Sequence, residues 1–397
     1  MKRWLGRALV AMAAVWVVAG CAPRPSPALL TPIAAASATV ARPPQPTTAP
    51  PTTPPFAVSP IPAPDADATP AATPAAPIIH LLFTGDINPG RCPAQVSLAN
   101  NDFTLPYQVV GEALRAADIT IGSLDGALSD FSPPSPCPET MNLIGPARTV
   151  EGLQYAGFDV LTVAANHAKD CGLQGWNCSD QTFRDTLANL RRAGIQPAGG
   201  GEDLAAALAP VIIERQGVRF AFIGLTEIGP NTFAAANRPG TAPLSDRNLP
   251  AVLAAITAAR QAADVVIVLP HWGVEYAETP SANQRRWAGE LVAAGATLVI
   301  GNHPHVVQPV ELFPETGQSA PRAVVAYALG NFVFDQGPWR NRQGVLFEAT
   351  FAGPVLTRWR LRPIHIVSLY QPVWPDETES QAILSGVATA GAALPAR

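Results

Sequence analysis

Short apolar runs recur from residue 78 onward and alternate with longer stretches whose apolar positions follow helical spacing. The runs are rich in β-branched residues and apolar at nearly every position, which is typical of strands buried on both faces of a largely parallel sheet. The pattern therefore predicts an α/β fold. Five of the runs stop directly before polar residues; they are 78–84, 119–124, 158–163, 265–269 and 297–300.

The stretches between these runs predict helices, and the late part of the chain predicts more strands. The final helix has Ser281 and Gln284 at the spacing of a capping box and stops before Gly295. The helices are expected at 106–117, 180–193, 249–263 and 281–294. Further strands, expected to form a second sheet, lie at 219–224, 345–351 and 359–366.

The first twenty residues have the pattern of an export signal. Basic residues precede an apolar stretch at 8–18, and small residues follow directly before Cys21. This arrangement resembles the cleavage box of bacterial lipoproteins, so 1–20 would be the signal peptide and Cys21 the lipidated first residue. The apolar stretch is short for a membrane span. A plain secretory signal and a retained anchor are the alternatives.

Residues 22–77 have a different composition, with 17 prolines among 56 residues and mostly Ala and Thr between them. Such a segment cannot bury a core and favours extended polyproline conformations. At about 3.1 Å per residue it would span at most roughly 170 Å. We therefore expect a disordered tether, followed by one domain at 78–397, in a lipid-anchored, extracytoplasmic protein of the cell envelope. A proline-rich ligand for a partner would need an aromatic or basic cluster, which this segment lacks.

Four cysteines remain when Cys21 is set aside. In an exported chain an even number favours disulfides, and four cysteines allow three pairings. Cys171 and Cys178 enclose a short loop, so we expect them to pair and Cys92 to pair with Cys137. The competing interpretation, a four-thiolate zinc site, needs spacings that these residues do not have.

The polar residues that follow the apolar runs suggest one divalent-metal site. Ligands of parallel sheets bind at the carboxyl ends of the strands, where these side chains would meet. Imidazole and carboxylate together suit zinc, manganese or iron. His80 lies inside a strand and His365 in a late apolar run, so both are expected to be structural. The residues at the run ends are Asp86, Asp125, His167, His271, His303 and His305.

Six ordered motifs carry a family resemblance that covers about residues 78–370. They resemble those of the CapA-type capsule, or poly-γ-glutamate, biosynthesis proteins, which are similar to the calcineurin-like metallophosphoesterases. The motifs are Gly85-Asp86-Ile87-Asn88-Pro89-Gly90-Arg91, Ser123-Leu124-Asp125-Gly126, Ala165-Asn166-His167-Ala168-Lys169-Asp170-Cys171-Gly172, His271-Trp272-Gly273-Val274-Glu275-Tyr276, Gly301-Asn302-His303-Pro304-His305-Val306-Val307-Gln308 and Tyr327-Ala328-Leu329-Gly330-Asn331-Phe332.

The resemblance implies a four-layer α/β/β/α sandwich and a site for one or two metal ions. Asp86 would hold one metal and Asp125 would bridge two. Asn166 would bind the second metal, and His167 would be the acid that protonates a leaving group. The implied metal ligands are Asp86, Asn88, Asp125, Asn166, His271, His303 and His305.

Two positions depart from the metallophosphoesterase pattern. Asn88 stands where those enzymes have a histidine, so the first metal would lose an imidazole. Asp125 is the bridging acid where CapA-type proteins more often have Glu, and a shorter carboxylate can still bridge.

Several residues beside the motifs have two interpretations each. Arg91 would bind an anionic substrate group through its planar guanidinium, or would form a structural salt bridge. Glu275 and Tyr276 would orient His271 or line the pocket, or pack as loop residues. Asn331 and Asp335 are expected to support the site from behind the ligands.

Charge and motifs leave two classes of function. The net charge of −4 offers no basic face for nucleic acid, and anionic polymers would have to be held by the metals and a few arginines. The first class is a metal-dependent hydrolase acting on a phosphoester or on an amide of a γ-glutamyl polymer. The second is a non-catalytic accessory subunit of capsular polymer synthesis or export, working with membrane-embedded synthesis subunits.

Overall fold

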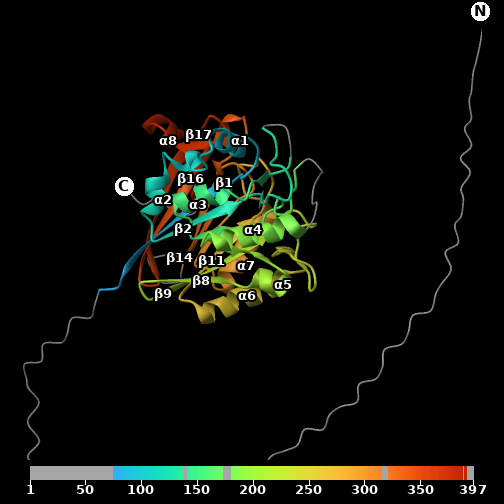
Figure 1. Cartoon of the computed structure of the whole chain (residues 1–397). Coiled ribbons are helices and arrows are strands. Elements are labelled where there is room, and N and C mark those ends of the chain that lie inside the picture. The colour runs from blue at the N-terminus through green and yellow to red at the C-terminus, as the bar shows by residue number, and fades with distance from the viewer. Residues whose placement is uncertain (1–74, 138–140, 173–179, 315–320, 388, 391–397) are drawn as a thin grey trace, which may run out of the picture. The chain divides into compact units, whose positions relative to one another are not determined.

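A computed structural model describes residues 75–137, 141–172, 180–314, 321–387 and 389–390 (Figure 1). Two large β-sheets dominate these residues. The expected signal peptide, Cys21 and almost all of the tether lie outside the described residues, as does Cys178. Among the helices that are described, none has the length and apolar character needed to cross a membrane.

The first sheet is built around strand β1, which pairs parallel with β2 on one side and antiparallel with β16 on the other, while its end also pairs parallel with β15. Its order is β18-β17-β16-β1-β2-β5-β6, with β15 paired to the end of β1. The strands are β1 (Ile78–Ile87), β2 (Ile119–Leu124), β5 (Val160–Thr162), β6 (Gln196–Ala198), β15 (Asn331–Val333), β16 (Gln343–Ala352), β17 (Val355–Val367) and β18 (Gln371–Val373).

The second sheet has a parallel centre, β9-β11-β12-β14, flanked by antiparallel β8 and β13. Its strands are β8 (Val211–Arg215), β9 (Val218–Thr226), β11 (Val265–His271), β12 (Leu298–Ile300), β13 (Val310–Pro314), β14 (Pro321–Ala326) and β19 (Thr389–Ala390). Two small pairs complete the strands: β3 (Ala127–Leu128) with β4 (Ile144–Gly145), and β7 (Gly200–Gly201) with β10 (Gly240–Thr241).

Three apolar cores separate four layers. Alternate residues of each buried strand face opposite sides, so Val265 and Ile267 of β11 face the core between the sheets while Val266 and Val268 face the helices outside. Phe83 meets Phe347 edge to face in the central core. The expected α/β/β/α sandwich is therefore confirmed. The helices are α1 (Arg91–Asn100), α2 (Gly111–Arg115), α3 (Thr149–Ala156), α4 (Asp180–Arg192), α5 (Leu204–Leu208), α6 (Leu249–Ala262), α7 (Ala282–Ala294) and α8 (Glu377–Ser385), with 3-10 turns η1 (Leu105–Tyr107) and η2 (Trp339–Arg342).

The helix predictions for α4, α6 and α7 are confirmed to within two residues. The capping box of α7 is present, because Ser281 Oγ accepts from the Gln284 amide at 3.2 Å and Gln284 Oε1 accepts from the Ser281 amide at 2.8 Å. The single helix expected at 106–117 is instead η1 followed by α2. Helical spacing of Tyr107, Val110 and Leu114 marks their burial in one core and does not require an unbroken helix.

The expected composition of the second sheet was wrong. β9 joins β11 and β12 there, but β16 and β17 extend the first sheet by pairing antiparallel to β1. The five runs that end in polar residues are likewise divided between both sheets. Local pattern reveals where a strand lies but not which distant strand it pairs with, since pairing depends on contacts far apart in sequence.

The Cys92–Cys137 disulfide is confirmed, with 4.5 Å between the two Cα atoms. It ties the first turn of α1 to the segment that follows β3. The bond contradicts a four-thiolate zinc site. The expected partner of Cys171, Cys178, lies outside the described residues.

Candidate metal centre

Side chains from both sheets converge where their parallel strands end. Asp86 is the second-last residue of β1, and Asp125 directly follows β2. His271 is the last residue of β11, and His303 and His305 lie in the loop after β12. All five are buried, with at most 4% of each residue exposed. The sequence prediction that these strand ends meet at one place agrees with the geometry, although two sheets supply them.

Two carboxylates form the floor of this cluster. Asp86 accepts hydrogen bonds from Ser123 Oγ at 2.9 Å and from the His303 amide at 3.0 Å. Asp125 Oδ1 lies 3.7 Å from His271 Nε2 and its Oδ2 lies 3.9 Å from His305 Nε2. Among the residues that the structure describes, neither oxygen of Asp125 has a hydrogen-bond partner. Burial raises the pKa of Asp125 to about 6 and that of Asp86 well above its ordinary value, the latter also through the charge of Asp125.

Three imidazoles face these carboxylates in their neutral form. His271 Nε2 lies 2.8 Å from Asn166 Oδ1 and 3.2 Å from His303 Nδ1, while its Nδ1 has no hydrogen-bond partner and lies 3.7 Å from Asp86. Burial lowers the pKa of His303 to about 3 and that of His305 to about 4, and it lowers the pKa of His271 well below the usual value. Neutral imidazole is the form that binds metal ions.

Two of these histidines have a backbone conformation that is strained for a residue other than glycine. His303 has φ of 99° and His305 has φ of 57°, a region that non-glycine residues rarely adopt. Tight packing behind the loop supports it: a Cβ on Gly301 would stand 2.1 Å from the Tyr327 carbonyl. In this conformation the ring centroids of His303 and His305 lie 5.9 Å apart.

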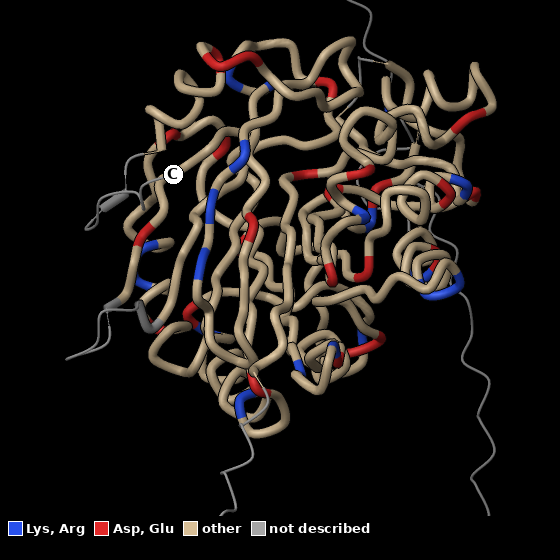
Figure 2. Tube along the Cα trace, turned by 90° about the vertical axis from the view of Figure 1, so that its left-hand side faces the viewer, with Lys and Arg blue, Asp and Glu red and all other residues tan. Residues whose placement is uncertain are grey.

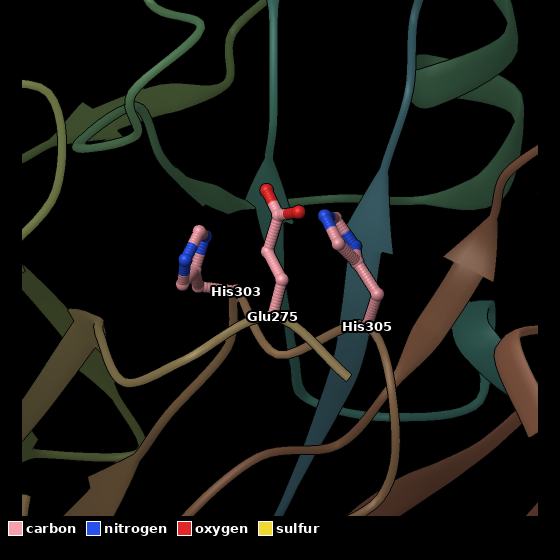
Figure 3. A group of neighbouring side chains, drawn as sticks. All are labelled: Glu275, His303 and His305. Carbon is pink, nitrogen blue, oxygen red and sulfur yellow. The ribbon is translucent and has the colours of Figure 1, made fainter. Parts of the chain in front are cut away.

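Glu275 joins the cluster from the loop after β11. Ligand atoms of Glu275, His303 and His305 lie within 4.8 Å of one another, and Figure 3 shows the carboxylate between the two imidazoles. The sequence pattern placed Glu275 among the supporting residues. Its position makes it a candidate ligand in its own right. The apolar run of β11 ends at His271, four residues before Glu275, so the end of that run did not mark Glu275 as a ligand.

The residues present fit a divalent cation. Asp125 offers two carboxylate oxygens, and His271 offers a ring nitrogen, that are fully buried and unpaired. Leaving buried polar atoms unpaired costs roughly 1–3 kcal/mol each, more for a charge. A cation bound by these atoms would offset that cost. The donor set of imidazole and carboxylate without thiolate suits zinc, manganese or iron.

Asn88 has a different environment from the other expected ligands. Its Oδ1 accepts from the Gly90 amide at 2.8 Å and its Nδ2 donates to Asp335 at 3.1 Å. Asp335 in turn pairs with Arg91, whose Nε donates to it at 3.0 Å. Both ends of the Asn88 amide are thus engaged, the nitrogen with Asp335 of the Arg91–Asp335 pair and the oxygen with the Gly90 backbone. A ligand role for Asn88 stays a prediction, and the structural salt bridge foreseen for Arg91 is present.

A cavity of about 290 Å³ opens beside the cluster. Its wall includes Arg91, His167, Glu275, Tyr276 and His305. Arg91 therefore reaches the cavity as well as its Asp335 partner. Tyr276 is half exposed at the rim and accepts from Gln336 Nε2 at 3.3 Å through its hydroxyl.

His167 is fixed by a carboxylate that the sequence analysis did not single out. Its Nδ1 lies 2.6 Å from Asp170 Oδ2, which also accepts from the Leu143 amide at 2.7 Å. Burial lowers the pKa of His167, but the charges of Asp125 and Asp170 outweigh burial and raise it to about 9. His305 is oriented in a similar way, because its Nδ1 lies 2.9 Å from Asn331 Oδ1.

Sequence comparison identifies the family. A family model described as bacterial capsule synthesis protein PGA_cap matches residues 80–336. The chain belongs to this family. It is 30% identical over 310 residues to the PGA biosynthesis protein CapA of Bacillus subtilis (strain 168), which covers 77% of each chain. It is also 30% identical over 275 residues to the capsule biosynthesis protein CapA of Bacillus anthracis, which covers 68% of this chain and 63% of that protein.

Solved structures with related architecture have low identity to this chain. The NAD nucleotidase of Haemophilus influenzae is 12% identical with a TM-score of 0.38, and the match covers 80% of this chain and 57% of that one. The sulfate thiohydrolase SoxB of Thermus thermophilus is 14% identical with a TM-score of 0.41, and the match covers 77% of this chain and 59% of that one. The CapA-type resemblance carried by the six motifs is confirmed by the family match.

Proposed function

We propose that this CapA-family chain holds a divalent metal in the buried cluster and acts there as a hydrolase in the metabolism of a capsular poly-γ-glutamate. The bond broken would be a phosphoester or a γ-glutamyl amide. The observation that carries the proposal is the unpaired carboxylate of Asp125, buried opposite the neutral imidazoles of His271 and His305. The names of the relatives suggest the polymer, and the metal-binding residues of the cluster suggest hydrolysis.

The cluster has the parts that a hydrolytic site requires. Asp125, His271 and His303 would hold the cation, with Asp86, His305, Glu275 and Asn166 completing the set. When bound, such an ion lowers the pKa of a water molecule and polarises the oxygen of the scissile bond. Ser123 and the His303 amide keep the Asp86 carboxylate oriented, and Asn331 does the same for His305.

His167 is placed to donate a proton to the leaving group. It lines the cavity, and Asp170 holds its Nδ1 so that Nε2 is the nitrogen available for proton transfer. The nearby carboxylates that raise its pKa keep it protonated at neutral pH. A positioned acid of this kind contributes roughly 10²–10⁴-fold to a rate.

Arg91 contributes a guanidinium to the cavity wall. Asp335 and, through it, Asn88 fix its guanidinium, so little side-chain entropy is lost when an anionic substrate group binds. A phosphate group or a carboxylate of the polymer would pair with the Arg91 guanidinium.

The accessory function is the second candidate, and the geometry of Asn88 favours it. An amide whose oxygen already accepts from Gly90 leaves the first metal position with one donor fewer than in a two-metal hydrolase. Metal binding without turnover would be the signature of such a subunit.

We further propose that the chain acts outside the cytoplasm, attached to a membrane through a lipid on Cys21. The basic, apolar and small-residue segments before Cys21 support this placement, and the proline-rich tether would separate the domain from the membrane. Radiolabelled palmitate incorporation into the expressed chain and its loss in Cys21→Ala would test the anchor.

The catalytic proposal is tested with the purified full chain. Metal content is measured by mass spectrometry, followed by turnover of a model phosphodiester and of poly-γ-glutamate. His303→Ala should lose both metal and turnover, whereas Gln261→Ala, which changes an exposed residue of α6, should keep both. A chain that binds no divalent metal after reconstitution would refute the proposal, and metal without turnover would favour the accessory function.

A further inference from the structure

Strand β17 carries three arginines on the outer face of the first sheet. Arg358, Arg360 and Arg362 alternate with Trp359 and Leu361, which pack into the core between the sheets. Because alternate residues of a strand share a face, the three arginines lie on one face with their Cα atoms about 7 Å apart along the strand. Figure 2 shows blue segments following one another along a strand on the side that faces the viewer.

The row lies where the helical cover of this sheet ends. Leu82 and Leu346 on the same face belong to the core under the helices. Beyond that core the face is polar: His80 and Glu348 line two adjoining hollows of about 240 and 180 Å³ together with the arginines. Ala113 of α2, with Ala116 and Ala117 that follow this helix, lines the other side of the larger hollow. The arginines therefore stand in a groove rather than on a flat surface.

The groove has more positive than negative charge. Glu348 pairs with Arg360 and lies 4.0 Å from Arg362, whose guanidinium also stacks 3.5 Å from the ring centre of Trp374. Within the described residues, no hydrogen bond or ion pair engages the side chain of Arg358. One carboxylate thus faces three guanidinium groups, in a chain whose net charge is −4.

This groove is separate from the metal centre. His80 pairs with Thr350 at the start of β1, and Asp86 lies six residues further along the same strand. At about 3.3 Å per residue the two places are roughly 20 Å apart. A ligand in the groove would not touch the metal ligands unless it were a long chain.

We propose that the β17 groove, lined by Arg358, Arg360 and Arg362, binds an anionic polymer whose carboxylates recur along its length. The identification of this polymer as capsular polyglutamate rests on the proposed function. Each exposed arginine–carboxylate contact contributes only about 0.5 kcal/mol, so a single carboxylate binds weakly. A polymer presents many carboxylates to the row at once, and repeated weak contacts add up to measurable affinity.

The shape of the groove favours a polymer over a bilayer. The arginines are flanked by α2 on one side, so a single extended chain can reach them while a flat lipid surface would meet the helix first. The arginines could instead protect the edge of the sheet. β18 pairs only with residues 365–367 of β17, so the part of β17 that carries the arginines is an edge strand. Charges on an edge strand oppose pairing with other chains, and that role would need no polymer.

The test measures binding of fluorescently labelled poly-γ-glutamate to the full chain by anisotropy at low and at physiological salt. The variant is the triple substitution Arg358→Gln, Arg360→Gln, Arg362→Gln. The control is Arg184→Gln, Arg191→Gln, Arg192→Gln on α4, three exposed arginines whose loss changes the net charge equally, from −4 to −7. Loss of three contacts of about 0.5 kcal/mol predicts about tenfold weaker binding in the variant.

The proposal predicts wild-type binding that weakens with salt, a tenfold loss in the β17 variant and less than a threefold loss in the α4 control. Equal losses of polymer affinity in both variants would show an effect of net charge and would overturn the proposal. Unchanged binding with new self-association of the β17 variant would assign the arginines to edge protection. Binding to vesicles of anionic lipid in place of the polymer would also overturn it.

Failure of this proposal can be told apart from failure of the proposed function. Metal content and the metal-induced rise in melting temperature should be the same in the β17 variant and in wild type, because the groove is distant from the cluster. A chain without metal that still binds polymer through β17 would sustain this inference and refute only the hydrolase.

Discussion

The substitution Asp125→Asn should change stability in opposite directions in the metal-free and metal-bound protein. In the metal-free chain the Asp125 carboxylate is fully buried and unpaired, so folding raises its pKa from 3.8 to about 6. That difference corresponds to about 3 kcal/mol of lost stability at neutral pH, at about 1.4 kcal/mol per pKa unit. The amide of Asn is still a buried polar group, so we expect the variant to gain about 1–3 kcal/mol.

The gain should depend on pH in a defined way. A carboxyl whose folded pKa is raised favours the folded state below the unfolded pKa, and this contribution is lost as pH rises through the folded pKa. The stability difference between Asp125→Asn and wild type should therefore be smallest below pH 3.8 and reach its full value above about pH 6. For a domain of about 320 residues, 3 kcal/mol corresponds to a melting shift of roughly 4 °C.

The assay is scanning calorimetry of both proteins after chelation and again with excess Mn²⁺ or Zn²⁺. Metal at about 100 times its dissociation constant should stabilise wild type by about 2.7 kcal/mol and the variant by much less. Asp246→Asn is the control, since Asp246 forms an exposed pair with Arg286 that solvent screens, so its loss should change the melting temperature little in either state. A metal-free variant that melts below wild type at neutral pH would contradict the burial cost of the Asp125 carboxylate, and a variant stabilised by metal as much as wild type would contradict its role as a metal ligand.

Three further outcomes follow from the same geometry. His167→Asn should lower turnover by roughly 10²-fold or more while metal content by mass spectrometry stays unchanged, and loss of metal would contradict its role as a proton donor. Asp170→Asn should lower turnover less and shift the alkaline limb of the pH–rate profile downward, because it removes a charge that raises the His167 pKa; an unmoved limb would exclude that coupling. Replacing Cys92 and Cys137 with serine opens a loop with a sequence separation of 45, which predicts a loss of about 4 kcal/mol in chemical denaturation, and a loss below about 1 kcal/mol would contradict it.

The positions of the site residues could be predicted because they end apolar runs. Asp86, Asp125 and His271 each follow or close a run that reads as a buried strand, and the carboxyl ends of parallel strands meet at one edge. The same reasoning could not show that the strands belong to two sheets. That division depends on β16 folding back beside β1, a pairing between residues more than 250 positions apart.

Loop residues of the site were harder to predict. Glu275 reaches the cluster because the loop after β11 turns toward His303, and no periodicity encodes that turn. Asp170 follows His167 by three residues, so its contact with the imidazole depends on the turn between them. Asn88 has the spacing of a ligand, but its amide is taken by Gly90 and Asp335, a competition that sequence spacing cannot show.

Anomalous X-ray diffraction from crystals of the chain grown with Mn²⁺ or Zn²⁺ would show whether the buried cluster binds a metal ion. We expect a metal peak about 2.0–2.2 Å from an Asp125 oxygen and from nitrogens of His271 and His303. A peak bound elsewhere, with these three side chains uncoordinated at saturating metal, would contradict it.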